Sequence, residues 1–343
     1  MASGVLFGLT AALCWGVADY CARGATRTVG TFLTLLVVQI IAVAAFLVFV
    51  APFGLLQLAA LAHAPLSTVL AAALLNLLIM VGAALLYRAF AIGVIALVSP
   101  IAAGFAAITT LLALIFGERP TVAQIVGLIL TLVGVVIAST VPNPHASQTA
   151  PVALAHGQRR RLLAPGVIES LAASVLFGVC YYALRDVSSL GGVTVAFIGK
   201  VADLVALGAL ALLAPVGVYG WRAWRGARQM KASPELLART CIEAKTTVQY
   251  PWYALRLPTM DGGTLGRFLV FVIPTSLLDT AANVAYNVGI DNAGALTSVV
   301  ATLSSLFSVV TVLLAWVFLR ERLARWQWVG VAAIFVGVAL VNW

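Results

Sequence analysis

Residues 4–23 read GVLFGLTAALCWGVADYCAR, and residues 166–185 read GVIESLAASVLFGVCYYALR. The two stretches align without a gap: Gly16 meets a glycine in the second copy, and Trp15 is matched by Phe177. A duplication of this kind predicts a fold built from two related halves. It also predicts that the first stretch is a helix of the fold and not a cleaved signal peptide.

The composition excludes a water-soluble globular protein. The chain has 343 residues, of which 63% are hydrophobic and 9% charged, and its mean hydropathy is +1.09. Soluble domains carry about 25% charged residues. The net charge is +9, but the basic residues lie mostly between apolar segments. This distribution is typical of membrane anchoring and not of nucleic-acid binding. The sequence therefore predicts an integral membrane protein.

Apolar runs of the length needed to cross a bilayer, about 20 residues, occur along the whole chain. Backbone groups in lipid must be hydrogen-bonded within their own segment, so each run is expected to be a helix. The ten predicted spans cover residues 4–22, 30–52, 67–90, 94–116, 122–141, 165–184, 192–218, 266–289, 294–319 and 326–343. We therefore predict an all-α integral membrane fold with ten transmembrane helices.

The predicted domains are two five-helix repeats, at 1–141 and 165–343, joined by a polar linker at 142–164. A basic loop inserted at 220–264 separates two helices of the second repeat. Because five is odd, the second repeat must enter the membrane in the opposite sense. Inverted repeats of this kind are typical of secondary transporters, whose substrate site lies near the midplane between the halves.

An acid-arginine pair occurs at the same point of each half. Glu118 and Arg119 precede one predicted helix, and Glu321 and Arg322 precede its counterpart. An acid is stabilised near a helix N-terminus, and arginine can anchor to lipid headgroups. We interpret both pairs as helix starts at the membrane interface.

Cysteine and histidine spacing predicts neither a disulfide framework nor a metal site. We expect no catalytic residue, no metal and no cofactor. The expected partners are a small-molecule substrate and the lipid bilayer, with no nucleic acid, and the sequence leaves the oligomeric state open.

Several motifs, in order, resemble the EamA-like branch of the drug/metabolite transporter superfamily. They are Trp15-Gly16, LLYRAFAIGVIALVSP (85–100), GERPTVAQIVGLILTLVGVVI (117–137) and the segment 298–340. The resemblance implies a carrier for small metabolites in the plasma membrane, often an exporter of amino acids or related compounds. It also implies cytoplasmic termini, whereas the distribution of basic residues favours outside termini. Where the family often has a base in helix 2, this chain has Gln39.

Polar side chains form a stripe in the predicted helix 266–289. Asp279, Asn283 and Asn287 are spaced i, i+4 and i+8, which places them on one face, and Tyr286 flanks them. Polar groups at membrane depth usually face a cavity or a partner. We predict that the stripe lines a solute cavity. Hydrogen bonding between packed helices is the alternative.

A second acid lies in the first helix. Asp19 follows Trp15 by one turn and stands beside Tyr20. It could bind a substrate amine or carry a proton, which would couple transport to a proton gradient. A pair with Arg23 near the helix end is equally consistent with the sequence.

Two basic residues complete the predicted site. Lys200 could bind a substrate carboxylate, but Asp203 lies three residues away and favours a self-neutralised pair. Arg88 could bind a carboxylate or phosphate, or it could extend to the lipid interface.

Aromatic residues recur at equivalent depths of the first and sixth predicted helices. They are Trp15, Phe177, Tyr181 and Tyr182. Such residues usually serve packing, but their duplicated position makes all four candidates for the cavity wall, and we assign Trp15 and Tyr181 to the predicted site.

The pattern favours a secondary transporter of small polar metabolites, working by alternating access around a midplane cavity. A membrane receptor or scaffold acting through 220–264 is the alternative. An integral-membrane enzyme is least favoured, because the repeated acid-arginine pairs lack a nucleophile or histidine partner.

Overall fold

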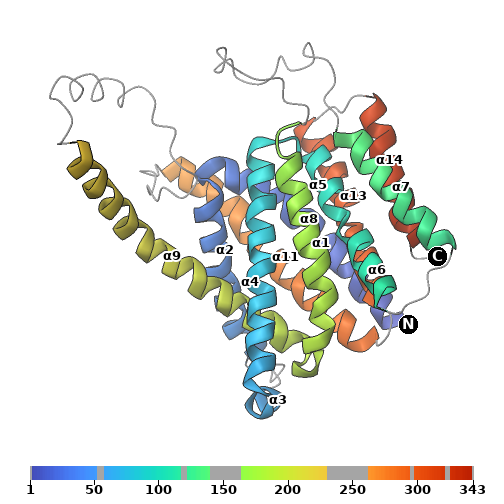
Figure 1. Cartoon of the computed structure of the whole chain (residues 1–343), viewed down its shortest axis with the longest axis horizontal. Coiled ribbons are helices and arrows are strands. Elements are labelled where there is room, and N and C mark those ends of the chain that lie inside the picture. Colours follow the sequence, from blue (N-terminus) through green and yellow to red (C-terminus); the bar gives the residue numbers. More distant parts are fainter. Residues whose placement is uncertain are drawn as a thin grey trace.

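The computed structural model is a bundle of helices (Figure 1). It describes residues 2–51, 58–116, 122–139, 164–229, 262–293, 297–320 and 325–341, and no strand occurs within these ranges. The α-helices are α1 (Ala2–Val29), α2 (Thr31–Ala45), α3 (Leu58–His63), α4 (Leu66–Ile92), α5 (Ile95–Ala103), α6 (Phe105–Ile115), α7 (Val122–Ser139), α8 (Val167–Ala183), α9 (Gly192–Gln229), α11 (Gly262–Ala293), α12 (Thr297–Ser305), α13 (Phe307–Leu314) and α14 (Arg325–Val341). Three of these helices are extended by short turns of another type. The π-helical turns η1 (Phe46–Val50) and η5 (Ala315–Leu319) follow α2 and α13, and the 3-10 helix η4 (Leu184–Leu190) follows α8.

Within the described residues, six helical segments are long and apolar enough to cross a membrane. They are Thr31–Val50, Leu66–Ile92, Ile95–Ala113, Val167–Leu190, Gly192–Leu213 and Gly262–Asp291. Large apolar side chains such as Leu70, Leu74 and Val205 are exposed on their outer faces. Such faces are stable against lipid and not against water. The prediction of an all-helical, multi-pass membrane protein is therefore confirmed.

The helix ends differ from the sequence prediction around the insertion. Helix α9 continues to Gln229 and α11 begins at Gly262, so both helices enter the segment 220–264, predicted as a loop. The added α9 residues, WRAWRGARQ, are rich in alanine and arginine and contain no proline, which favours a helix. The remainder of the insertion, the linker up to residue 163 and both acid-arginine pairs lie outside the described residues.

Two predicted spans are broken at their middle. Gly104 separates α5 from α6, and Leu306 separates α12 from α13. At each break the amide bonds three residues back, Gly104 N–H to the Ile101 carbonyl at 3.2 Å and Leu306 N–H to the Leu303 carbonyl at 3.3 Å. A tighter turn of this kind interrupts the α-helical bonding pattern. The residues that follow the breaks, Phe105 and Phe307, are buried and line an interior cavity.

Glycines bring α1 against α13 and α8 against α6 in the same way. A Cβ on Gly16 would lie 2.7 Å from the Phe307 carbonyl oxygen, and one on Gly178 would lie 2.9 Å from the Phe105 carbonyl oxygen. Only a residue without a side chain permits such an approach.

Threonines reinforce these two crossings. The Thr311 hydroxyl donates to the Gly16 carbonyl at 3.2 Å, and the Thr109 hydroxyl donates to the Gly178 carbonyl at 3.0 Å. The two crossings fix Trp15 and Phe177, one residue before each glycine, at the centre of the bundle.

The most extensive helix contacts join α1 to α11, α7 to α14 and α4 to α8. Figure 1 shows α7 and α14 side by side at one edge of the bundle, and α9 extending away from the opposite side. The polar residues gather in an interior space, which is surrounded by helices α1, α2, α4, α9 and α11.

Candidate functional site

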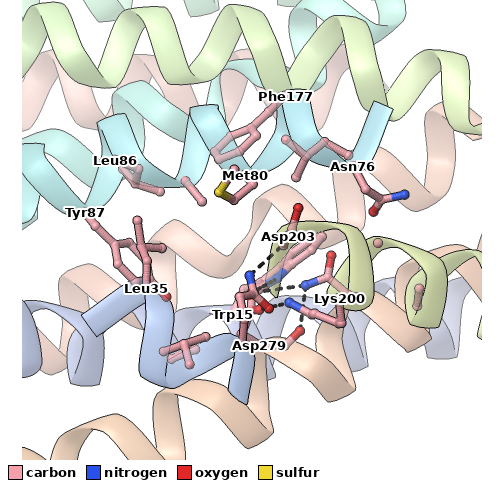
Figure 2. Close-up of a pocket in the computed structure, with 18 of the residues that line it drawn as sticks. Trp15, Leu35, Asn76, Met80, Leu86, Tyr87, Phe177, Lys200, Asp203 and Asp279 are labelled. Carbon is pink, nitrogen blue, oxygen red and sulfur yellow. Dashed lines mark hydrogen bonds and ion pairs between the residues drawn. The ribbon is translucent and has the colours of Figure 1, made fainter. Parts of the chain in front are cut away.

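A polar cavity lies inside the apolar bundle (Figure 2). Its empty space, counted together with the open solvent at its mouth, is about 830 Å³. Polar or amphipathic side chains from α1, α2, α4, α8, α9 and α11 line it: Trp15, Asp19, Gln39, Asn76, Tyr87, Tyr181, Lys200, Asp203, Asp279 and Asn283. The arrangement is suited to holding a small polar solute away from lipid.

The carboxylate of Asp279 is the centre of the polar wall. Lys200 Nζ lies 2.5 Å from Asp279 Oδ2, and the two side chains are 7% and 22% exposed. Trp15 Nε1 donates to Asp279 Oδ1 at 3.2 Å, and Asn283 Nδ2 donates to the same oxygen at 3.1 Å. Helices α1, α9 and α11 therefore meet at one carboxylate. A buried ion pair is tolerated where further hydrogen bonds satisfy its charges, as they do here.

A second polar pair joins α2 to α9. Gln39 Nε2 donates to Asp203 Oδ2 at 3.1 Å, and both side chains are buried. An ionised carboxylate can only accept hydrogen bonds, which fixes the amide nitrogen of Gln39 toward Asp203. Gln39 Oε1 and Asp203 Oδ1 have no hydrogen-bond partner.

Asp19 is the third carboxylate in the lining. It is buried on α1, and its Oδ2 atom has no hydrogen-bond partner. The described residues that line the cavity include three carboxylates, those of Asp19, Asp203 and Asp279, and one ammonium group, that of Lys200. Carboxylates therefore outnumber cationic side chains in this lining.

The residues that α6, α8 and α13 contribute to the lining are all aromatic. They are Phe105, Phe177, Tyr181 and Phe307. The Trp15 and Tyr181 ring centroids are 5.6 Å apart, and the Phe105 and Phe307 rings stack at 6.4 Å with 15° between their planes. Rings at these distances pack favourably. They separate the cavity from that part of the bundle.

The wall formed by α4 is mostly apolar. Figure 2 shows Met80 and Leu86 across the cavity from Lys200 and Asp279. Asn76 is the amide in this wall, and its Nδ2 donates to the Ala72 carbonyl at 2.8 Å. The cavity therefore has one charged wall and one apolar wall.

Six residues predicted for the site lie together in the cavity lining: Trp15, Asp19, Tyr181, Lys200, Asp279 and Asn283. The predicted stripe on α11 is present as a continuous chain of contacts. Asn283 Nδ2 donates to the Asp279 carbonyl at 2.7 Å, and Asn287 Nδ2 donates to the Asn283 carbonyl at 2.8 Å. Asn287, the last member, is buried and lies outside the lining.

Three further predicted residues also lie outside this lining. Tyr20 packs on Phe318, with ring centroids 5.8 Å apart. Arg88 Nε lies 3.4 Å from Glu169 Oε1 in a partly exposed ion pair. Successive residues on a helix point about 100° apart, so neither Tyr20 nor Arg88 can share the direction of the lining residue that precedes it. Tyr286 is fully buried against Trp15 and Tyr181, at 5.6 and 4.7 Å between ring centroids.

The predicted Lys200–Asp203 pair is wrong. Lys200 forms its ion pair with Asp279 on α11, and Asp203 accepts from Gln39 on α2. The spacing of three residues permits a pair on one helix face, but the packed neighbours supply better-placed partners.

Sequence reasoning missed Gln39, Asn76 and Tyr87 as lining residues. Gln39 and Asn76 are amides within the otherwise apolar spans 30–52 and 67–90. Burying an amide in an apolar segment costs free energy. The presence of an amide in each of these spans is therefore the signal that could have identified both residues.

Comparison with known proteins agrees with this fold. The model of the EamA-like transporter family matches residues 2–140 and 247–343. A protein of known crystal structure aligns over 99% of this chain and 96% of its own, with 16% identity and a TM-score of 0.53. At that identity the likeness concerns the fold alone. No curated protein matches the chain.

Proposed function

This chain belongs to the EamA-like transporter family, whose members are membrane transporters of the drug/metabolite type, and from that premise we propose a more specific function. The protein is a secondary carrier that exports small polar metabolites, such as amino acids, from the cell across the plasma membrane. The observation that carries the proposal is the buried Lys200–Asp279 pair, held in a polar cavity inside an apolar bundle. Charges at this depth are costly and mark a solute or ion path.

The charge pair is suited to reversible binding. A charged group of the solute can take the place of either residue as the partner of the other. Neither Lys200 nor Asp279 is then left as an uncompensated buried charge. Trp15 and Asn283 keep the Asp279 carboxylate oriented during such an exchange, because both donate to its second oxygen. Binding and release then need no large change in buried charge.

The carrier works by alternating access between two inverted five-helix repeats, with ten spans in total. The matched helix breaks at Gly104 and Leu306 support this arrangement. So do the matched crossings at Gly16 and Gly178, because these glycines occupy the same position in the two aligned sequence copies. Related halves of opposite direction can exchange conformations, which moves the opening from one side of the membrane to the other.

The aromatic lining is the closed side in this conformation. Phe105 and Phe307 stack where α6 and α13 begin, and Trp15 and Tyr181 pack beside them. In the alternating-access cycle these rings separate when that side opens.

Protons are the proposed coupling ion. Asp19 and Asp279 line the same cavity, and a carboxylate that binds either a proton or a solute links the two movements. A proton gradient would then drive the solute in the opposite direction.

Transport by purified protein in liposomes tests the proposal. The panel contains labelled amino acids, sugars, nucleosides and polyamines, each with and without an imposed proton gradient. We expect uptake of at least one class, and at least a tenfold loss of that uptake in Asp279→Asn and Asn283→Ala. Asp186→Asn is the matched control, because its side chain is 71% exposed and lies outside the lining.

Wild-type rates in both cavity variants would overturn the assignment of the α11 site. Deletion of 230–261 separates the carrier from a receptor or scaffold acting through the insertion. A carrier keeps its transport without that segment.

A further inference from the structure

The unpaired polar atoms of the cavity share one chemistry. Among the described lining residues, the buried atoms without a hydrogen-bond partner are Asp19 Oδ2, Gln39 Oε1 and Asp203 Oδ1. All are oxygens that accept hydrogen bonds. Each belongs to a side chain no more than 7% exposed. A buried acceptor without a donor is unfavourable, so a bound solute gains by bringing donors to these atoms.

Each side-chain nitrogen of the polar residues in the described lining already donates at least one hydrogen bond. Trp15, Asn283 and Lys200 all donate to Asp279. Gln39 donates to Asp203, and Asn76 donates to the Ala72 carbonyl. A solute that offers donors therefore meets oxygens without a partner, whereas a solute that offers only acceptors leaves those oxygens unsatisfied.

Charge and aromatic content point in the same direction. The three carboxylates of Asp19, Asp203 and Asp279 exceed the single ammonium group in the described lining. The aromatic side chains of Trp15 and Tyr181 also line the space, and aromatic rings attract cations. The apolar α4 wall can cover an alkyl stem, as it does for the stems of amphipathic side chains.

We propose that the solute is an organic cation, an alkyl amine or diamine whose ammonium N–H groups donate to Asp203, Gln39 and Asp19. This inference rests on the proposed carrier function and narrows its substrate class. Amines are bound in preference to zwitterionic amino acids and to carboxylates, because the described lining has three carboxylates against one ammonium group and leaves three acceptor oxygens without a donor.

A series of equal carbon length tests the charge preference. The probes are labelled 1,4-diaminobutane, 4-aminobutanoate and butanedioate, which are a dication, a zwitterion and a dianion at neutral pH. Equilibrium dialysis against purified protein measures binding, and uptake into proteoliposomes measures transport. We expect the diamine to bind at least tenfold more tightly than 4-aminobutanoate, and butanedioate to bind more weakly still.

Variants locate the binding atoms. Asp203→Asn, which removes the charge at nearly constant shape, should weaken diamine binding at least tenfold, and Asp203→Glu should restore part of it. Gln39→Leu should weaken binding by a smaller factor, because it removes a neutral acceptor. Asp186→Asn is the control and should bind as the wild type does. Thermal unfolding of each variant checks folding, and the wild-type series decides the charge preference even if a variant does not fold.

The outcomes separate this inference from the carrier function. Tighter binding of 4-aminobutanoate or butanedioate than of the diamine overturns the inference and leaves the carrier intact. Diamine binding that is unaffected by Asp203→Asn also overturns it. If no solute of the wider panel is transported, the carrier function is overturned. The dialysis result still decides which charge the cavity prefers.

Discussion

The Lys200–Asp279 ion pair allows a quantitative test of how the charged wall is held together. The variants are Lys200→Met, Asp279→Asn and the double variant. Methionine keeps most of the length of lysine without its charge, and asparagine nearly preserves the shape of aspartate. The pair is buried on the lysine side and 22% exposed on the aspartate side.

The expected magnitudes follow from the contacts. Removing one partner of a buried ion pair costs about 3–5 kcal/mol, because the other charge stays buried without compensation. We expect about 3 kcal/mol, the lower end, for Lys200→Met, because Asp279 keeps the Trp15 and Asn283 donors and is partly exposed. Asp279→Asn should cost at least as much. The double variant, which leaves neither charge, should be no less stable than either single variant, so the coupling energy is at least about 3 kcal/mol.

Thermal unfolding in detergent measures these differences through the chain's own thiols. Cys21 and Cys180 are buried, so a thiol-reactive fluorophore labels them when the bundle opens. A Cys241→Ser background removes the thiol that lies outside the described residues. If the double variant loses as much stability as the two single variants together, the two charges are not coupled and the reasoning about this site fails.

Four further substitutions test the packing. Gly178→Ala places a Cβ 2.5 Å from a neighbouring side chain and should lower stability by about 1–3 kcal/mol. Gly208→Ala, where a Cβ has nothing within 4 Å, should raise stability by about 0.5–1 kcal/mol. Equal melting temperatures of the two variants would contradict the close crossing at Gly178. Ser276→Ala removes a buried hydrogen bond of 2.6 Å to the Val38 carbonyl and should lower stability by about 1 kcal/mol, again measured by melting. Arg27→Met removes the guanidinium that donates to two carbonyls at the end of α4, and it should lower stability by about 1.5–3 kcal/mol. An unchanged melting temperature would show that these contacts do not hold α1 to α4.

Most of the fold could be predicted from the sequence because a bilayer leaves few choices. Apolar runs of sufficient length must become helices in lipid, and the predicted spans lie on helices within the described residues. The helix breaks at Gly104 and Leu306 were not predicted. They depend on the tight crossings next to them, and these involve partners distant in the chain. The continuation of α9 to Gln229 was not predicted, because the arginines after residue 220 end the apolar run although they do not end the helix.

The sequence alone determined which residue types lie at membrane depth, since the few polar side chains within apolar runs are conspicuous. Trp15, Asp19 and Lys200 were found in this way. Only the tertiary structure decided which of them meet. Spacing along one helix favoured a Lys200–Asp203 pair, yet Lys200 pairs with Asp279, and Trp15 donates to the same carboxylate across 264 positions of the chain. Local periodicity determines the face on which a side chain lies, but its partner depends on how the helices pack.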